Sequence, residues 1–233
     1  MPTATRHRLL PLLAAPVVVA IVVTGVWVAG GVITDDYRGS MALTAFWFAV
    51  SGAACLLVAR RQRALRVPVI AAYLFTAGAV GAYLGATTLR DDVVHERVIT
   101  AAAPAAAPDA GTPALPAAAA AEPEPVELAS GRFRSHEHAT TGTARMIRDT
   151  DGRRYLTLTS FSTSPGPDLR VRLVPGDSVD GGADGAVDLG ALKGNRGDQQ
   201  YAIPRGADLS DHTVVIWCRA FSAPFGSAAL RQT

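Results

Sequence analysis

Residues 9–31 read LLPLLAAPVVVAIVVTGVWVAGG, a stretch without a single charged side chain. Two further uncharged runs follow before Arg90. An α-helix needs about 20 apolar residues to cross the hydrocarbon core of a bilayer, and each of the three runs reaches that length. The sequence therefore predicts a membrane anchor over residues 1–90 that contains three transmembrane helices, at residues 9–33, 41–59 and 68–88.

The composition of the whole chain agrees with a bilayer as one partner. Hydrophobic residues make up 49 % of the 233 residues and charged residues only 18 %, against a usual charged share of about 25 %. A net charge of +2 is too small to indicate nucleic-acid binding. Two cysteines exclude a disulfide-stapled scaffold and a four-cysteine zinc site.

Arginines give the predicted orientation. The N-terminus carries Arg6 and Arg8, and the connection between the second and third helices carries four arginines within residues 60–66. The other two connections have no excess of positive charge. Because cytoplasmic loops are enriched in Lys and Arg, we expect a multi-pass protein of the cell membrane with a cytoplasmic N-terminus and an extracytoplasmic C-terminal domain.

A cleaved signal peptide is the alternative interpretation of the first apolar run. That run is longer than the apolar core of about 7–15 residues in such peptides, and no clear A-x-A cleavage site follows it. Even after cleavage, the second and third helices would leave the C-terminal part outside.

The predicted helices carry no ionisable side chain that would indicate transport, so we interpret them as an anchor. Gly78, Gly81 and Gly85 are small residues at which neighbouring helices are expected to approach closely.

Alanine and proline dominate residues 91–125, most strongly in AAAPAAAPDAGTPALPAAAAAEPEP at residues 101–125. This segment has too little large apolar surface to offset the entropy lost on ordering. It is therefore predicted to be an extended linker that holds the following domain away from the bilayer.

Residues 126–233 show the pattern of an all-β domain. In DLRVRLV, at residues 168–174, apolar side chains alternate with arginines, and glycine, proline and aspartate clusters separate this run from its neighbours. The segment Lys193-Gly194-Asn195 is predicted to be a hairpin connection. Seven or eight short strands in this length favour an antiparallel β-sandwich with a jelly-roll-like arrangement. The strands are expected at residues 130–135, 140–148, 154–161, 168–174, 186–190, 199–203, 213–221 and 225–230.

Four segments of this domain occur in the order found in the DM13 domain family, which residues 128–231 resemble. They are GRFRSHEHATTGTARM (131–146), YLTLTSFSTSPGPDLRVRL (155–173), VDLGALKGNRGDQQYAIP (187–204) and VVIWCRAFSAPFGSAAL (214–230). The resemblance implies an extracytoplasmic β-sandwich module. It also implies a role in electron transfer or redox modification through the family's cysteine, which corresponds to Cys218, with His138 at the family's histidine position.

The residues themselves leave two interpretations of Cys218 open. In the first, Cys218 is a reactive or metal-binding thiol, because Cys55 lies in a predicted helix and is no partner for it. In the second, it is a small buried hydrophobe, since Val214 and Ile216 share its face of an expected strand.

Three further side chains extend the first interpretation. His136 and His138 fall on one face if their segment is extended, and with Cys218 they are the expected ligands of a metal. Trp217 and His138 are the expected contacts of a cofactor, for which haem and copper are the candidates although no specific motif indicates either.

The predicted function is therefore a membrane-tethered redox module of the cell envelope with Cys218 at its centre and an envelope redox partner. The alternative is a non-catalytic module that binds a surface ligand or mediates adhesion, with Cys218 in a structural role. No motif decides whether the protein is an enzyme.

Overall fold

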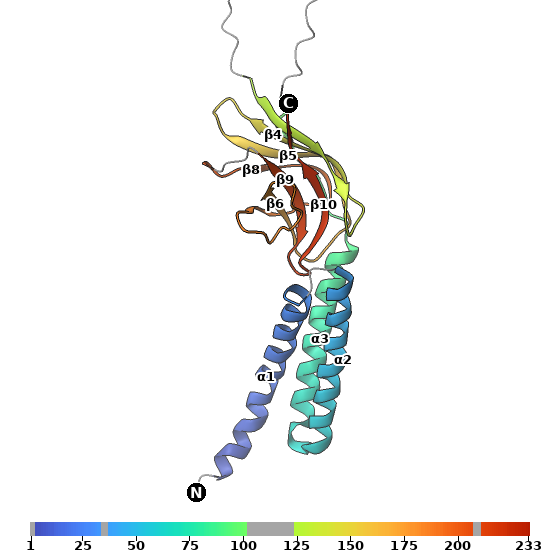
Figure 1. Ribbon diagram of the computed structural model, residues 1–233. Coiled ribbons are helices and arrows are strands. Elements are labelled where there is room, and N and C mark those ends of the chain that lie inside the picture. The colour runs from blue at the N-terminus through green and yellow to red at the C-terminus, as the bar shows by residue number, and fades with distance from the viewer. Residues whose placement is uncertain (1–2, 34–36, 102–123, 207–210) are drawn as a thin grey trace, which may run out of the picture. The chain divides into compact units, whose positions relative to one another are not determined.

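The computed structural model describes residues 3–33, 37–101, 124–206 and 211–233 (Figure 1). The chain divides into two compact units, of which one contains the helices and the other nearly all of the strand residues. The middle part of the expected linker, residues 102–123, lies outside the described residues.

The first unit contains the three predicted helices. They are α1 (Thr3–Gly31), α2 (Tyr37–Arg61) and α3 (Arg66–Leu89), and the short 3-10 turn η1 (Arg63–Leu65) joins the last two. All three helices are long and apolar enough to cross a membrane, which confirms the prediction from the uncharged runs.

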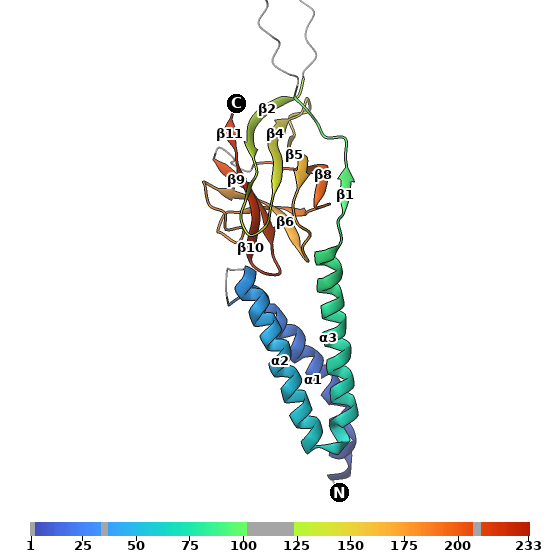
Figure 2. The same cartoon turned by 90° about the vertical axis from the view of Figure 1, so that its right-hand side faces the viewer.

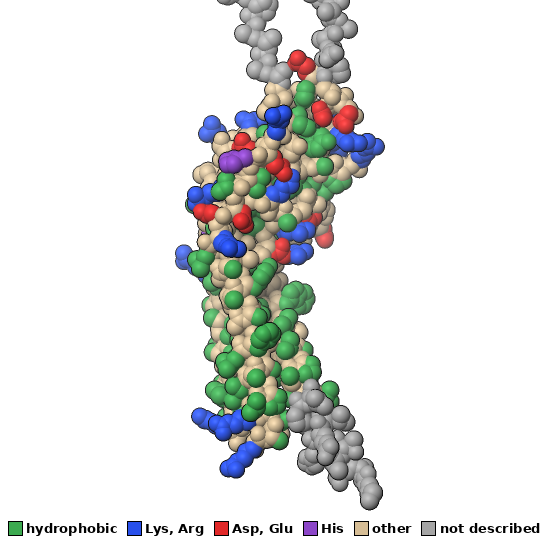
Figure 3. Space-filling view, turned by 180° about the vertical axis from the view of Figure 1, so that it is seen from behind, with side chains coloured by type: hydrophobic (Ala, Val, Ile, Leu, Met, Phe, Trp, Pro, Cys, Tyr) green, Lys and Arg blue, Asp and Glu red, His purple; other side chains and the backbone are tan. Residues whose placement is uncertain are grey.

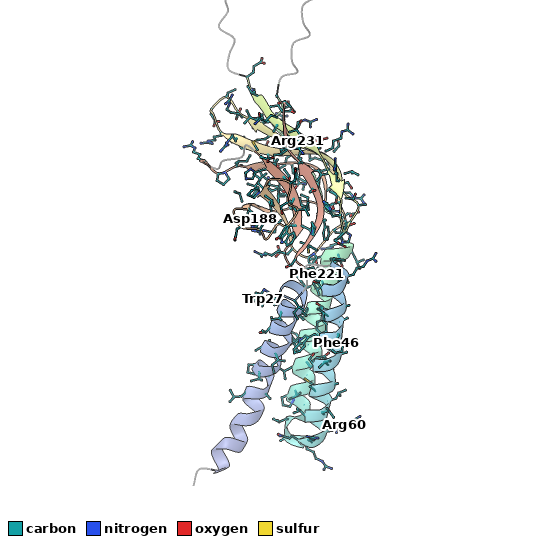
Figure 4. The ribbon with its side chains drawn as sticks, in the orientation of Figure 1. Trp27, Phe46, Arg60, Asp188, Phe221 and Arg231 are labelled. Atoms are coloured by element: carbon teal, nitrogen blue, oxygen red, sulfur yellow. The ribbon has the colours of Figure 1, made fainter. Side chains whose placement is uncertain are left out.

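The outer surface of the helices has the character of a lipid-facing surface. Trp27 and Phe46 project from α1 and α2 and are 69 % and 65 % exposed (Figure 4). Hydrophobic side chains cover the helices in the space-filling view, and basic side chains gather at one end of them (Figure 3). Arg60 marks this end (Figure 4), which is the connection between α2 and α3.

The helices approach one another at other glycines than expected. A Cβ atom on Gly25 would lie 2.0 Å from the Trp47 ring, so only glycine admits that ring against α1. By contrast, a Cβ atom on Gly78, Gly81 or Gly85 would meet no atom within 4 Å. The prediction that these three glycines mediate close helix packing is therefore wrong, because their spacing does not determine which face is turned to a neighbour.

Two sheets of mostly antiparallel strands confirm the predicted all-β class. We call these strands and their connections the sheet domain, and all of it except Pro165–Leu169 and Cys218–Ala223 belongs to the second unit. The six-stranded sheet has the order β1-β8-β5-β4-β2-β11, and the five-stranded sheet has the order β3-β10-β9-β6-β7 (Figures 1 and 2). The strands are β1 (Val93–His95), β2 (Val126–Arg132), β3 (Arg134–Ser135), β4 (Thr141–Arg148), β5 (Arg154–Ser162), β6 (Leu169–Pro175), β7 (Val187–Ala191), β8 (Arg196–Ala202), β9 (His212–Cys218), β10 (Ala223–Ala229) and β11 (Arg231–Gln232).

Alternation along the strands builds the core of the sheet domain. In β6, Leu169, Val171 and Leu173 are buried, whereas Arg170 and Arg172 between them are partly exposed. The largest fully buried side chains include Phe161 of β5 and Phe225 of β10. The side chain pattern read from the sequence therefore gives the correct inward face for this strand.

Two connections differ from the expectation. The segment 193–195 is not a hairpin, because β7 before it and β8 after it belong to different sheets. In addition, the expected linker begins with a strand: β1 pairs in parallel with β8, with Val94 opposite Gly197 (Figure 2). We call residues 91–99 the edge segment, because they cover the outer edge of β8.

Candidate functional site

Cys218 is the last residue of β9 and is completely buried, with 0 % of its surface exposed. The expected strand 213–221 ends here, and residues 219–222 form a turn before β10. Successive side chains of a strand point to opposite faces, so Cys218 shares its face with Val214 and Ile216 and not with Trp217. Both of these neighbours are also fully buried.

An ion pair fastens the turn that follows Cys218. The Arg219 side chain donates through Nε to Oδ2 of Asp168 at 2.7 Å, and its backbone N–H donates to the Asp168 carbonyl at 2.9 Å. The N–H of Phe221 donates to the carbonyl of Cys218 at 3.3 Å. Ser222 completes the turn with a φ of 45°, in the left-handed region that a non-glycine residue rarely adopts.

Burial raises the pKa of the Cys218 thiol to about 11, because the thiolate would lose its hydration. Backbone N–H groups of the turn lower this pKa in part, whereas the Asp168 carboxylate raises it. A thiol with this pKa carries about 1 thiolate per 10⁴ molecules at pH 7. In this conformation Cys218 is therefore neither accessible nor ionised.

The two histidines lie beside β10. His136 is exposed and its Nε2 is 2.8 Å from Oγ of Ser227. The ring of His138 lies against Phe225, with 3.9 Å between ring centroids. Burial lowers the pKa of His138, although the Glu137 carboxylate opposes this effect, so the ring is kept neutral near pH 7.

The expected metal ligands His136, His138 and Cys218 are not gathered into one group. Within the described ranges, no three side chains of His, Cys, Asp or Glu are placed so that they could hold a metal ion together. The donor set for copper or haem that the sequence offered is thus not assembled around Cys218.

Trp217, the other expected cofactor contact, belongs to a small satellite core. It packs with Val174 and Val215, and Ala183 and Ala186 cover this group from the loop before β7. A Cβ atom on Gly181 would lie 2.5 Å from the indole, so a glycine is needed there. The indole is 6 % exposed and is therefore not available as an aromatic platform.

A hollow lined with arginines is the feature that sequence reasoning missed. It has a volume of about 530 Å³ and lies where β5 begins and β8 ends, with Arg153, Arg154 and Arg205 among its lining residues. Tyr155 pairs with Ala202 across these strands, which brings Arg205 to the Arg153-Arg154 pair. The adjacent Arg153 and Arg154 are the only local sequence signal of this hollow, because the third arginine, Arg205, comes from a distant part of the chain.

A buried glutamine of β8 organises the connection between β7 and β8 within the LKGNRGDQQY segment. Gln199 is 0 % exposed, and its Oε1 accepts hydrogen bonds from Lys193 N (3.1 Å), Gly194 N (3.3 Å) and the Tyr201 hydroxyl (2.8 Å). Its Nε2 donates to the Gly194 carbonyl at 2.8 Å. One side chain thus replaces the backbone pairing that this irregular segment lacks.

The described residues thus form three apolar helices and a two-sheet domain that contains a buried free cysteine. Residues 132–230 match the DM13 family model, described as "Electron transfer DM13". Residues 132–230, which form most of the sheet domain, are therefore similar to DM13 domains, and the match covers neither the helices nor the edge segment. The comparison with curated proteins and the comparison with solved structures gave no match.

Proposed function

We propose that this protein is a membrane-anchored electron-transfer module whose redox group is the thiol of Cys218. The observation that carries the proposal is the match of residues 132–230 to a family described by electron transfer. Cys218 supports it as the free thiol of the sheet domain within the described part of the chain. The apolar helices supply the membrane anchor in this proposal.

The burial of Cys218 determines how such chemistry proceeds. The turn 219–222 first opens, which exposes the thiol and lowers its pKa towards that of a solvated cysteine. The thiolate then attacks one sulfur of a partner's disulfide, and the other sulfur leaves as a thiolate with the electron pair of the broken bond. One thiolate of an electron-donating dithiol then attacks the Cys218 sulfur of the mixed disulfide, and the partner's sulfur leaves as a thiolate with the electron pair of the broken bond. The second thiolate of the dithiol attacks its neighbouring sulfur in the new mixed disulfide, which oxidises the dithiol to a disulfide and releases Cys218 as a thiolate.

Alkylation kinetics test this mechanism in the full chain carrying Cys55→Ala. We expect iodoacetamide to label Cys218 through opening of the turn alone, at a rate that low denaturant concentrations leave unchanged. A rate that rises with denaturant in parallel with global unfolding would contradict the mechanism, because the thiol would then be accessible only in the unfolded chain.

The ion pair of the turn offers a graded version of this experiment. Arg219→Ala removes the bond to Asp168, and because exposed ion pairs contribute about 0.2–1 kcal/mol, we expect labelling about two to five times faster. Arg231→Ala is the matched control, since Arg231 forms an exposed ion pair with Asp177 outside this turn. Equal rates in the two variants would show that the turn does not control access to Cys218.

The orientation is part of the proposal, with the arginine-rich connection of α2 and α3 in the cytoplasm. In a chain without its natural cysteines, we expect Thr233→Cys to react with a membrane-impermeant maleimide on intact cells. Gln62→Cys is expected to react only after the membrane is permeabilised. The reverse pattern would place the sheet domain in the cytoplasm and would contradict a redox role outside it.

The arginine-lined hollow supports a second candidate function, the binding of an anionic ligand without redox chemistry. Arg153, Arg154 and Arg205 line this hollow together with Asp151, the one carboxylate among its described lining residues, which pairs with Arg153 at 3.2 Å. Bidentate guanidinium contacts to phosphate or carboxylate groups are among the stronger polar contacts that proteins form. In this candidate function, the buried Cys218 is a packing residue.

Phosphate titration separates the second candidate from the first. We expect the double variant Arg153→Ala, Arg205→Ala to bind inorganic phosphate at least about tenfold more weakly than the unmodified chain, the loss that 1.4 kcal/mol produces. Arg132→Ala, which removes an exposed arginine of β2, is expected to leave binding unchanged. Undiminished binding in the double variant would exclude the hollow as the site.

A further inference from the structure

Main-chain and side-chain hydrogen bonds together hold the edge segment against the edge of β8. Besides the strand register of β1, Arg196 N donates to the Asp92 carbonyl at 3.2 Å and Glu96 N donates to the Asp198 carbonyl at 2.9 Å. The side-chain amide of Asn195 adds two hydrogen bonds. Its Oδ1 accepts from Asp92 N at 2.7 Å, and its Nδ2 donates to Asp91 Oδ1 at 2.8 Å.

Carboxylates at both ends of the edge segment are matched by cations on the sheet domain. Lys193 Nζ lies 2.7 Å from one carboxylate oxygen of Glu96, and the backbone N–H of Gln200 donates to the other at 2.9 Å. Burial tends to raise the pKa of Glu96, but these contacts outweigh burial and lower it. At the other end, Arg196 lies 3.1 Å from Asp91.

Two glycines, Gly194 and Gly197, leave room for the close approach of the edge segment. A Cβ atom on Gly194 would lie 2.6 Å from the Asp92 carbonyl oxygen and from a Val94 methyl group, and one on Gly197 would lie 2.0 Å from the Val94 carbonyl oxygen. The three atoms nearest to a Cβ atom at Gly194, and the three nearest to one at Gly197, all belong to the edge segment. The two glycines of the KGNRGDQ sequence are therefore explained by the approach of another strand.

We infer that residues 193–200 form a capture site for an extended acidic strand, and that in this chain the site is occupied by residues 91–99 of the same molecule. The captured strand begins directly after α3, whereas the covalent path to β2 runs through residues 102–123. The bound edge segment thus retains the sheet domain on the anchor independently of that path. This inference goes beyond the proposed function and does not depend on Cys218.

Cutting the linker tests the inference in the full chain. A protease site inserted between residues 112 and 113 leaves the edge segment on the membrane fragment and the rest of the sheet domain on the other. After cleavage in membrane vesicles, we expect the C-terminal fragment to sediment with the membrane. Prompt release of this fragment into the supernatant would overturn the inference.

A competing peptide and the variant Gly194→Val test whether the capture site is the cause of retention. The peptide DDVVHERVI, residues 91–99, is expected to accelerate release, and the same peptide with alanine in place of its first and sixth residues is not. Gly194→Val is expected to accelerate release at least about tenfold. Retention that neither the peptide nor Gly194→Val changes would show that other contacts hold the fragment.

A matched pair of glycine variants separates the effect of a steric clash with the edge segment from the effect of backbone strain. Gly197 and Gly190 have φ angles of 98° and 117°, and a Cβ atom on Gly190 would meet nothing within 4 Å. Gly197→Ala is expected to release the fragment faster than Gly190→Ala, which carries the same strain alone. Equal release rates in the two variants would contradict the inference. It would also be contradicted if the fragment bound to a differently tagged second copy of the protein instead of to its own anchor.

Discussion

Gln199→Leu is expected to destabilise the sheet domain by about 3–5 kcal/mol, the largest effect of a single substitution that we predict. Leucine has nearly the volume of glutamine, so the loss does not come from a cavity. It comes from Gly194 N, the Gly194 carbonyl and the Tyr201 hydroxyl, which lose their bonds to a side chain that is 0 % exposed. Lys193 N keeps the Tyr201 oxygen as an acceptor at 3.0 Å. Buried polar groups without partners cost about 1–3 kcal/mol each.

Denaturant titration of the full chain in detergent, followed by near-ultraviolet circular dichroism, measures this loss. Gln200→Leu is the control at the adjacent position, because Gln200 is partly exposed and its Oε1 accepts a hydrogen bond from the Ile99 N–H at 3.0 Å. We expect this control to lose less than about 1 kcal/mol. Similar losses in both variants would mean that Gln199 is not the centre of the segment.

Raising the pH from 9 to 11 is expected to remove about 2 kcal/mol of stability through Cys218 alone. The folded state raises the pKa of the thiol from 9.0 to about 11, so it binds this proton more tightly than the unfolded state does. The stabilising contribution is therefore complete below pH 9 and is lost as the pH rises through 11.

Cys218→Ala isolates this contribution, because its pH-independent packing loss appears equally at every pH. Burial raises the pKa of the Tyr201 phenol as well, but that effect is present in both proteins and cancels in the difference. The measurement is the unfolding free energy of both proteins at pH 8, 9, 10 and 11. Parallel pH profiles would mean that the Cys218 thiol is solvated in the native protein.

The parts of the fold that sequence reasoning predicted are those determined by local patterns. A charge-free run of sufficient length must be a buried or lipid-facing helix, and the alternation in LRVRLV assigns the faces of β6 without any knowledge of its neighbours. Strand ends were less accurate: the strand expected at residues 213–221 stops at Cys218. A turn held by Asp168 and Arg219 has no local signature, since its partners come from different loops.

Long-range pairing explains what was missed. Val93–His95 is too short to show any period, and it becomes a strand only because β8 offers an edge with two glycines and matching cations. The arginine-lined hollow likewise depends on the pairing of β5 with β8. The composition shows a chain with nearly balanced charge, and only the strand order shows that some of its arginines gather at one place.

The order of the six-stranded sheet has a consequence for biogenesis. Its two outermost strands, β1 and β11, are the first and the last strands among the described residues. During synthesis β1 has no partner until β8 is made, and the opposite edge of the sheet stays unpaired until β11 has left the ribosome. A prematurely terminated polypeptide would display an exposed strand border that invites aggregation, so truncation near the C-terminus should be poorly tolerated by cellular quality control.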